Sequence, residues 1–293
     1  MRLAGLGMVL ALMTGAGTAS AGTVSAGAAS AGIASVGTAS AQTGFLDRTV
    51  TVDGVAYRYQ VYVPVDYMPD REWPVALFLH GSGERGDDGT KQTNAGIGPA
   101  IRNDRKRFPL IVVMPQTREN TRWNGAMAKQ AMQALDASIL EFHGDPQRIY
   151  LTGMSMGGQG TWLLAAAHPH RFAAMAPICG FLRLKNDDDV VDPVADKLLV
   201  ADFPELLADN PSAAMARRIG GTPAWIFHGA DDDLVPVHNA QRMAAAMRAV
   251  GGEVRYSEYP GVNHGSWDRA YAEPELVSWL LSHRLDDNKT SRP

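Results

Sequence analysis

A five-residue pattern in the middle of the chain, Gly153-Met154-Ser155-Met156-Gly157, sets a serine hydroxyl between two glycines. A Gly-x-Ser-x-Gly turn between a buried strand and a helix strains the serine backbone and exposes its oxygen, and the glycines permit close backbone approach. Chance alone supplies the pattern about 0.15 times in such a chain, so its surroundings decide its weight. An apolar run precedes it at 148–151 and a helical pattern follows at 158–167. We therefore predict a nucleophile at Ser155, against the alternative of a structural glycine-rich turn.

A nucleophilic serine needs a histidine to take its proton and a carboxylate to orient that histidine. His264 lies in a loop directly after the strand-like run 253–259, where a base belongs, although a surface-loop histidine is the alternative reading. Three aspartates in a row, Asp231, Asp232 and Asp233, follow another apolar run. Periodicity does not separate these three candidates for the acid. The N–H of Met156, at the start of a helix, is an expected donor to an oxyanion.

Short apolar runs alternate with helical patterns along the chain, and these elements must position the reactive groups. The runs lie at 61–63, expected as an edge strand, and at 75–79, 110–114, 148–151 and 223–227; the helical patterns lie at 126–142, 159–167, 239–250 and 273–283. This alternation predicts an α/β fold with a mostly parallel central sheet and helices on both faces. In such sheets ligands bind beyond the carboxyl ends of the strands, which is where the candidate residues fall.

One acid-rich segment, 180–211, interrupts the alternation. A small cap over the site and a solvated surface excursion are both compatible with its mixture of aspartates and leucines. Its three consecutive aspartates, 187–189, do not by themselves make a metal site.

The N-terminus has the pattern of a secretory signal: Met1-Arg2, an apolar run to Met13, and small residues. We predict a signal peptide over 1–21, with cleavage after Ala21 or as late as Ala41. Residues 22–45 form a low-complexity segment rich in Ala, Gly and Ser, expected to be disordered or removed. A single catalytic domain is expected over 46–285 and a flexible tail over 286–293. The protein is thus predicted to be periplasmic or extracellular, without a stable membrane anchor.

Composition narrows the functional classes. The chain of 293 residues is 45% hydrophobic and 20% charged, with a formal net charge of -4, so it offers no broad basic face for nucleic acid. Its one cysteine, Cys179, lies in an apolar run and is interpreted as a core residue. No cysteine cluster or His-Glu-x-x-His pattern is present, and we expect neither a metal nor an organic cofactor. The oligomeric state is left open.

Three stretches resemble known families. His228-Gly229-x-x-Asp232-x-x-Val235-Pro236 is similar to the acid-strand motif of the carboxylesterase, dienelactone-hydrolase and acyl-thioesterase branches of the α/β hydrolases. That resemblance assigns the catalytic carboxylate to Asp232. The stretches 79–87 and 261–271 resemble a bacterial group of predicted peptidases and poly(3-hydroxybutyrate) depolymerase-like esterases. The resemblance covers 61–284 and implies the α/β-hydrolase fold.

The resemblance also gives a role to the loop after the run 75–79. It implies that the Ser82 N–H is the second oxyanion donor beside Met156, and that His80 holds this loop by hydrogen bonds. Gln116 and Trp123, after the run 110–114, are expected to line the substrate pocket, with simple packing as the alternative for Trp123. Glu84 and Arg85 either bind a polar substrate group or pair with each other.

These observations predict an exported serine carboxylesterase that works through an acyl-enzyme. Acyl or feruloyl esters of polysaccharides and short polyesters are the expected substrates. A serine peptidase of the same fold is the alternative, because the same triad cleaves amides. A non-catalytic binding protein on this fold is the remaining possibility.

Overall fold

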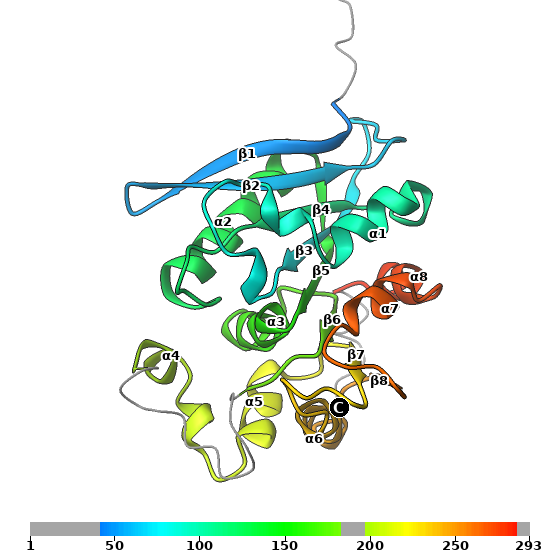
Figure 1. Cartoon of the computed structure of the whole chain (residues 1–293). Coiled ribbons are helices and arrows are strands. Elements are labelled where there is room, and N and C mark those ends of the chain that lie inside the picture. Colours follow the sequence, from blue (N-terminus) through cyan, green and yellow to red (C-terminus); the bar gives the residue numbers. More distant parts are fainter. Residues whose placement is uncertain (1–41, 183–196, 286–293) are drawn as a thin grey trace, which may run out of the picture. The chain divides into compact units, whose positions relative to one another are not determined.

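The computed structural model describes residues 42–182 and 197–285, and its centre is one eight-stranded sheet (Figure 1). The strands are β1 (Gly44–Val52), β2 (Val55–Val63), β3 (Trp73–Leu79), β4 (Ile111–Pro115), β5 (Gly144–Met154), β6 (Ala174–Ile178), β7 (Ala224–Gly229) and β8 (Val254–Tyr259). Their spatial order is β1-β2-β4-β3-β5-β6-β7-β8. β1 and β2 run antiparallel, and β2 also pairs antiparallel with β4, while all later neighbours are parallel.

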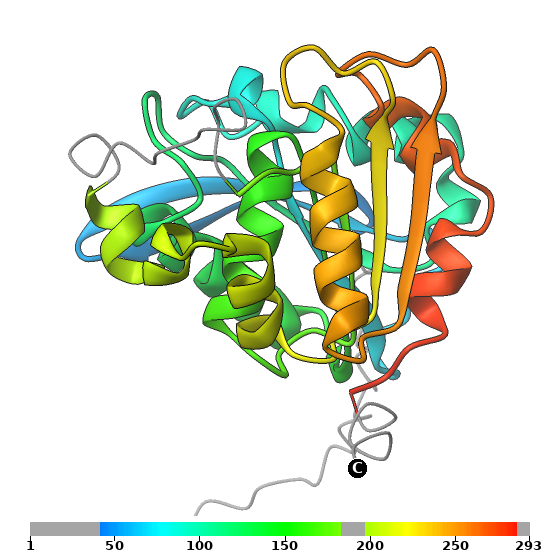
Figure 2. The same ribbon diagram turned by 90° about the horizontal axis from the view of Figure 1, so that it is seen from below.

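Helices cover both faces of this sheet, as Figure 2 shows from a second side. One apolar cluster joins a sheet face to α2 (Gly125–Glu141), α3 (Met156–Ala167), α5 (Pro211–Ile219) and α6 (His238–Ala249). The opposite face packs against α1 (Ile97–Asn103), α7 (Trp267–Ala272) and α8 (Leu276–Leu281). Alternate residues of the central strands enter the two clusters: Leu77 and Leu79 face the first, and Phe78 faces the second. The predicted α/β-hydrolase fold is confirmed.

The edge of the sheet differs from the prediction. Val61, expected in an edge strand, is paired on both sides, with Leu46 of β1 and with Val113 of β4. β1 was not predicted from the sequence. Only one of its faces is partly buried, and the polar residues on its other face weaken the apolar pattern. β1 begins at Gly44, two residues before the predicted start of the domain.

The acid-rich segment is described from residue 197 onward. It contains α4 (Lys197–Asp202) and a 3₁₀ turn, η4 (Pro204–Leu207), before α5 begins. Phe203 and Leu206 are buried in the cluster around α3, and Arg218 donates to the Ala166 carbonyl at the C-terminal end of that helix. This part therefore packs against α5, whose Arg218 also donates to the Asp202 carbonyl and pairs with Glu205. Residues 183–196, which complete the predicted cap, lie outside the described residues.

The predicted signal peptide, nearly all of the low-complexity segment and the C-terminal tail also lie outside the described residues. In the ranges that are described, none of the helices combines the length and the apolar character that a bilayer crossing requires.

The start of α3 is pressed against the ends of β3 and β5. A Cβ atom on Gly157 would lie 1.8 Å from the Leu79 carbonyl oxygen, and one on Gly153 would lie 2.3 Å from the Gly157 oxygen. Both contacts are with backbone atoms, which cannot rotate away. The two glycines of the pentapeptide are thus required by the approach of one backbone to another.

We predict that Gly157→Ala lowers the free energy of unfolding by about 2 kcal/mol or more, because the added methyl group overpacks this contact. Denaturant unfolding followed by circular dichroism measures the change. Gly221→Ala is the matched control, since its Cβ would meet nothing within 4 Å and its φ is not positive. Equal stability of the two variants would contradict this account of the turn.

Candidate active site

Ser155 stands at the junction of β5 and α3, at the carboxyl end of a central strand. Its φ of 54° lies in the left-handed region, which is strained for a residue with a Cβ atom. The Ser155 N–H donates to the Ile178 carbonyl of β6 at 2.9 Å and so fixes the strained residue to the neighbouring strand. The side chain is only partly buried, which leaves its hydroxyl accessible.

His264 and Asp232 complete a chain of hydrogen bonds from this hydroxyl. His264 Nε2 lies 2.8 Å from Ser155 Oγ, and Nδ1 lies 2.8 Å from Asp232 Oδ2. His264 belongs to the loop after β8, and Asp232 to the loop after β7. A serine, an imidazole and a carboxylate in this order are able to perform nucleophilic acyl transfer.

The three consecutive aspartates have different environments. Asp232 is buried, whereas Asp231 and Asp233 are exposed. Burial alone would raise the pKa of Asp232, but hydrogen bonds from His228, His264 and the Val235 N–H outweigh it and hold this pKa well below its usual range. The carboxylate that faces His264 is therefore ionised at neutral pH.

The two expected oxyanion donors each stand at the start of a helical turn. Met156 is the first residue of α3, and N–H groups in the first turn of a helix have no partner within that helix. Ser82 begins a 3₁₀ turn, η1 (Ser82–Glu84), directly after the loop at the end of β3. The positive end of the α3 dipole would also stabilise negative charge near Met156.

His80 holds the loop that carries Ser82. Its Nδ1–H donates to the Gly81 carbonyl at 2.6 Å, and its Nε2 accepts from the Thr117 N–H at 3.0 Å. Burial lowers the pKa of His80 to about 4, so the ring is neutral and has one donor and one acceptor for these two partners. This is the hydrogen-bonding role that the sequence predicted for His80.

Gln116 and Trp123, predicted to line the pocket, are almost fully buried, with 2% and 1% of their surface exposed. The Gln116 amide donates to the Glu84 carbonyl and accepts from the Gly89 N–H. The Trp123 indole N–H donates to the His80 carbonyl at 3.0 Å. Both side chains thus support the loop after β3 by hydrogen bonds to its backbone. Contact of either side chain with substrate stays a prediction.

Glu84 and Arg85 do not pair with each other within the described part of the chain. Burial raises the pKa of Glu84, although backbone N–H groups of the loop oppose this effect. Arg85 donates from Nε to the Thr121 carbonyl at 2.7 Å and from Nη2 to the Met156 sulfur at 2.9 Å. Burial lowers the pKa of Arg85, and the positive charge of Arg122 adds to this effect. A guanidinium group is thereby held beside the residue that follows the nucleophile.

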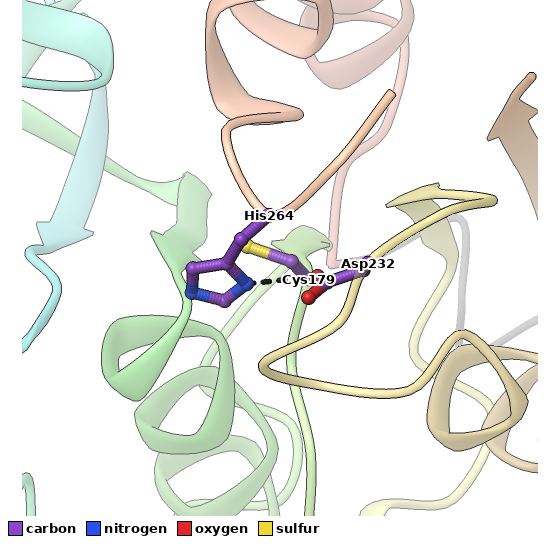
Figure 3. Close-up of side chains that lie close together, drawn as sticks. All are labelled: Cys179, Asp232 and His264. Carbon is purple, nitrogen blue, oxygen red and sulfur yellow. Dashed lines mark hydrogen bonds and ion pairs between the residues drawn. The ribbon is translucent and has the colours of Figure 1, made fainter. Parts of the chain in front are cut away.

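Cys179 lies beneath Asp232 and His264, and the three groups are close enough for metal binding to be considered. Figure 3 shows the three side chains gathered between loops that follow neighbouring strands, and their potential ligand atoms lie within 4.8 Å of one another. Asp232 and His264 are already joined by a hydrogen bond, and burial raises the pKa of the Cys179 thiol to about 12. A metal ion would have to displace both of these protons, so the arrangement favours proton transfer.

Two residues that were not predicted as site residues also contact the site. The Trp267 ring meets the His264 ring edge to face, with centroids 5.5 Å apart. His228 Nε2 lies 3.1 Å from Asp232 Oδ2, and both side chains are fully buried. The only signal for His228 was its place in the motif shared with Asp232.

The environments of the three aspartates lead to a prediction. Asp232→Asn should lower kcat by about 10⁴, because the amide stabilises the wrong imidazole tautomer, as in other triads. Asp231→Asn and Asp233→Asn are controls of identical chemistry, and each should retain activity within about threefold, as expected of exposed side chains away from the proton path. Initial rates on a 4-nitrophenyl ester measure all three; a loss confined to either control would reassign the acid.

Known proteins resemble this chain over much of its length. An uncharacterized secreted protein of Arthroderma benhamiae is 28% identical over 204 residues, which cover 65% of this chain and 21% of that protein. A putative carboxymethylenebutenolidase of Methylorubrum extorquens is 29% identical and covers 54% of this chain and 49% of its own length. The chain thus spans between about a fifth and a half of these curated relatives.

A crystal structure of a thermostable esterase superposes with a TM-score of 0.65 at 32% identity, covering 82% of this chain and 63% of the other. The sequence model of the prolyl oligopeptidase family matches residues 117–284, more than half of the chain, and this region contains Ser155, Asp232 and His264. The chain therefore belongs to the prolyl oligopeptidase family.

Proposed function

We propose that this chain is a serine carboxylesterase that hydrolyses carboxylic esters through an acyl-enzyme. Ser155 is the nucleophile, His264 is the base, and Asp232 is the carboxylate that orients the base. The observation that carries the proposal is the continuous hydrogen-bond chain from Ser155 Oγ through His264 to Asp232 Oδ2, with two bonds of 2.8 Å. The ester preference is supported by the likeness to a solved esterase at 32% identity.

The proposed reaction begins when Ser155 Oγ attacks the ester carbonyl carbon and its proton passes to His264 Nε2. Negative charge develops on the carbonyl oxygen, where the N–H groups of Ser82 and Met156 stabilise it. The tetrahedral intermediate collapses as His264 gives the proton to the leaving alkoxide. Water then attacks the acyl-enzyme by the same route, and Asp232 stabilises the imidazolium in both halves.

The second candidate function is amide hydrolysis. The family that the chain belongs to is named for oligopeptide cleavage, and this is the observation that favours a peptidase. The same nucleophile, base and acid would serve both reactions. What separates them is how well the site protonates an amine leaving group and binds a peptide.

Export is also part of the proposal. It rests on the signal-like N-terminal sequence and on the secreted relative from Arthroderma benhamiae. An exported esterase would meet acylated polysaccharides, feruloyl esters or short polyesters, and we propose these as substrates. Separation of a culture of the native host into cytoplasm, periplasm and medium, each blotted with an antibody, tests this directly; protein confined to the cytoplasm with residues 1–21 still attached would contradict it.

The enzyme proposal predicts covalent labelling of Ser155 by a fluorophosphonate. The wild type should be labelled at Ser155, as shown by mass spectrometry of the tryptic peptide, because the reagent traps an activated serine. Ser155→Ala is the matched control and should take up no label. An unlabelled wild type that is folded by circular dichroism would favour the non-catalytic binding protein.

The ester preference predicts a large difference between matched substrates. One acyl group is offered as its methyl ester and as its peptide amide, and kcat/KM for the ester should exceed that for the amide by at least about 10³, or about 4 kcal/mol in the transition state. Equal or greater turnover of the amide would replace the esterase assignment by the peptidase.

We propose further that Arg85 binds an oxygen atom of the substrate near the scissile ester. Its side chain is held by Thr121 and Met156, it forms no ion pair within the described residues, and its Nη1 hydrogens have no bond partner there. Arg85→Gln should therefore raise KM about tenfold for acetylated xylo-oligosaccharides, since hydrogen bonds to charged groups contribute about 1.5–3 kcal/mol. Arg122→Gln removes a neighbouring charge and serves as the control. An equal rise in KM for both variants would indicate that positive charge near the site matters, and not a direct contact of Arg85 with the substrate.

A further inference from the structure

The carboxylate of Asp232 accepts three hydrogen bonds, and a second histidine lies close to one of its oxygens. Oδ1 accepts from the backbone N–H groups of Leu234 at 3.0 Å and Val235 at 2.8 Å. Oδ2 accepts from His264 Nδ1 at 2.8 Å and faces His228 Nε2 at 3.1 Å. The oxygen that orients the base is therefore shared between two histidines.

The geometry determines which form of His228 is present. Its Nε2 also lies 2.8 Å from the Val235 carbonyl oxygen, so this nitrogen faces two atoms that only accept hydrogen bonds. Nε2 must therefore carry a hydrogen. Nδ1 is buried and has no hydrogen-bond partner among the described residues, and a second hydrogen there would be an unsatisfied buried donor. His228 is thus a neutral Nε2–H donor.

We infer that His228 is a positioning residue for the acid of the triad: its Nε2–H holds Asp232 Oδ2 and the Val235 carbonyl in place and limits the negative charge available to His264. This inference rests on the proposed role of Asp232. His228 is the next-to-last residue of β7, and Asp232 follows four residues later, so one donor connects the sheet to the loop that carries Asp232.

Among the groups around Asp232, His228 is the one that competes with His264 for the negative charge of the carboxylate. The titratable groups facing the carboxylate are His228 from β7, His264 from the loop after β8 and Cys179 from the end of β6. Cys179 is a buried, protonated thiol and contributes no charge. Of the two histidines, only His264 exchanges a proton with Ser155.

Packing alone would also explain a buried histidine, and two substitutions separate the explanations. His228→Gln retains an N–H donor of similar reach, whereas His228→Leu retains bulk and removes the donor. We expect kcat on a 4-nitrophenyl ester to fall on the order of ten- to hundredfold in His228→Leu, the range for a lost bond to a charged group, with KM nearly unchanged. His228→Gln should recover most of the loss.

The acid limb of the pH profile of kcat/KM gives a readout that packing does not change. Without the second donor, Asp232 attracts the imidazolium of His264 more strongly, so the limb should move to higher pH in His228→Leu and return toward the wild-type position in His228→Gln. Wild-type limbs in both variants, or an equal kcat loss in both, would overturn the inference. Thermal midpoints monitor folding of each variant.

A measurement on the unsubstituted protein covers the case in which His228→Leu does not fold. Nitrogen-15 NMR of labelled histidine should show His228 as an Nε2–H tautomer, coupled to a hydrogen in slow exchange. A Nδ1–H tautomer, or a doubly protonated ring at pH 7, would overturn the inference. This spectrum does not require activity, so it remains decisive if no ester is hydrolysed and the proposed function fails.

Discussion

The close approach of one backbone to another at the start of α3 is the constraint on which the site depends. The helix begins so near the ends of β3 and β5 that neither Gly153 nor Gly157 has room for a side chain. This packing holds Ser155 in a conformation that an unconstrained serine would leave, at a cost on the order of 1–3 kcal/mol. The buried apolar contacts of α3 with the sheet offset that cost and keep the hydroxyl directed outward.

A buried polar layer supports the loop after β3, which carries Ser82. His80, Gln116 and Trp123 have few exposed atoms, and nearly all their polar groups bind backbone atoms of this loop. A rigid loop matters because an oxyanion donor is effective only when it is already in place as charge develops. The loop thus depends on side chains that are far less accessible than Ser155 and His264.

Much of this arrangement could be predicted from the sequence. The strand, turn and helix around Ser155 have strong local patterns, and His264 follows a recognisable strand, so the sequence alone selects both as candidates. The three aspartates were not separable, because burial of Asp232 depends on how its loop folds against the loop after β8. Resemblance to known motifs selected Asp232, and the environments agree with that choice.

Side-chain direction explains what could not be predicted. Gln116 and Trp123 follow a strand end, and their buried side chains form hydrogen bonds with the backbone of the loop after β3, which no sequence pattern indicates. The contact of His228 with Asp232 depends on a turn that returns the chain toward its own strand, which no periodic pattern reveals. β1 was missed because a strand with one solvated face is only weakly apolar.

His264 follows the last strand of the sheet, whereas Ser155 follows a strand in the middle. β8 has one neighbour, β7, and its side chains are only partly buried or exposed. Such an edge element opens locally at a lower free energy than the central strands. Detachment of β8 would carry His264 away while the turn at Ser155 and both helical layers persist. We therefore expect the proposed activity to be lost on heating before the molecule unfolds globally, because the local stability of one edge strand positions His264.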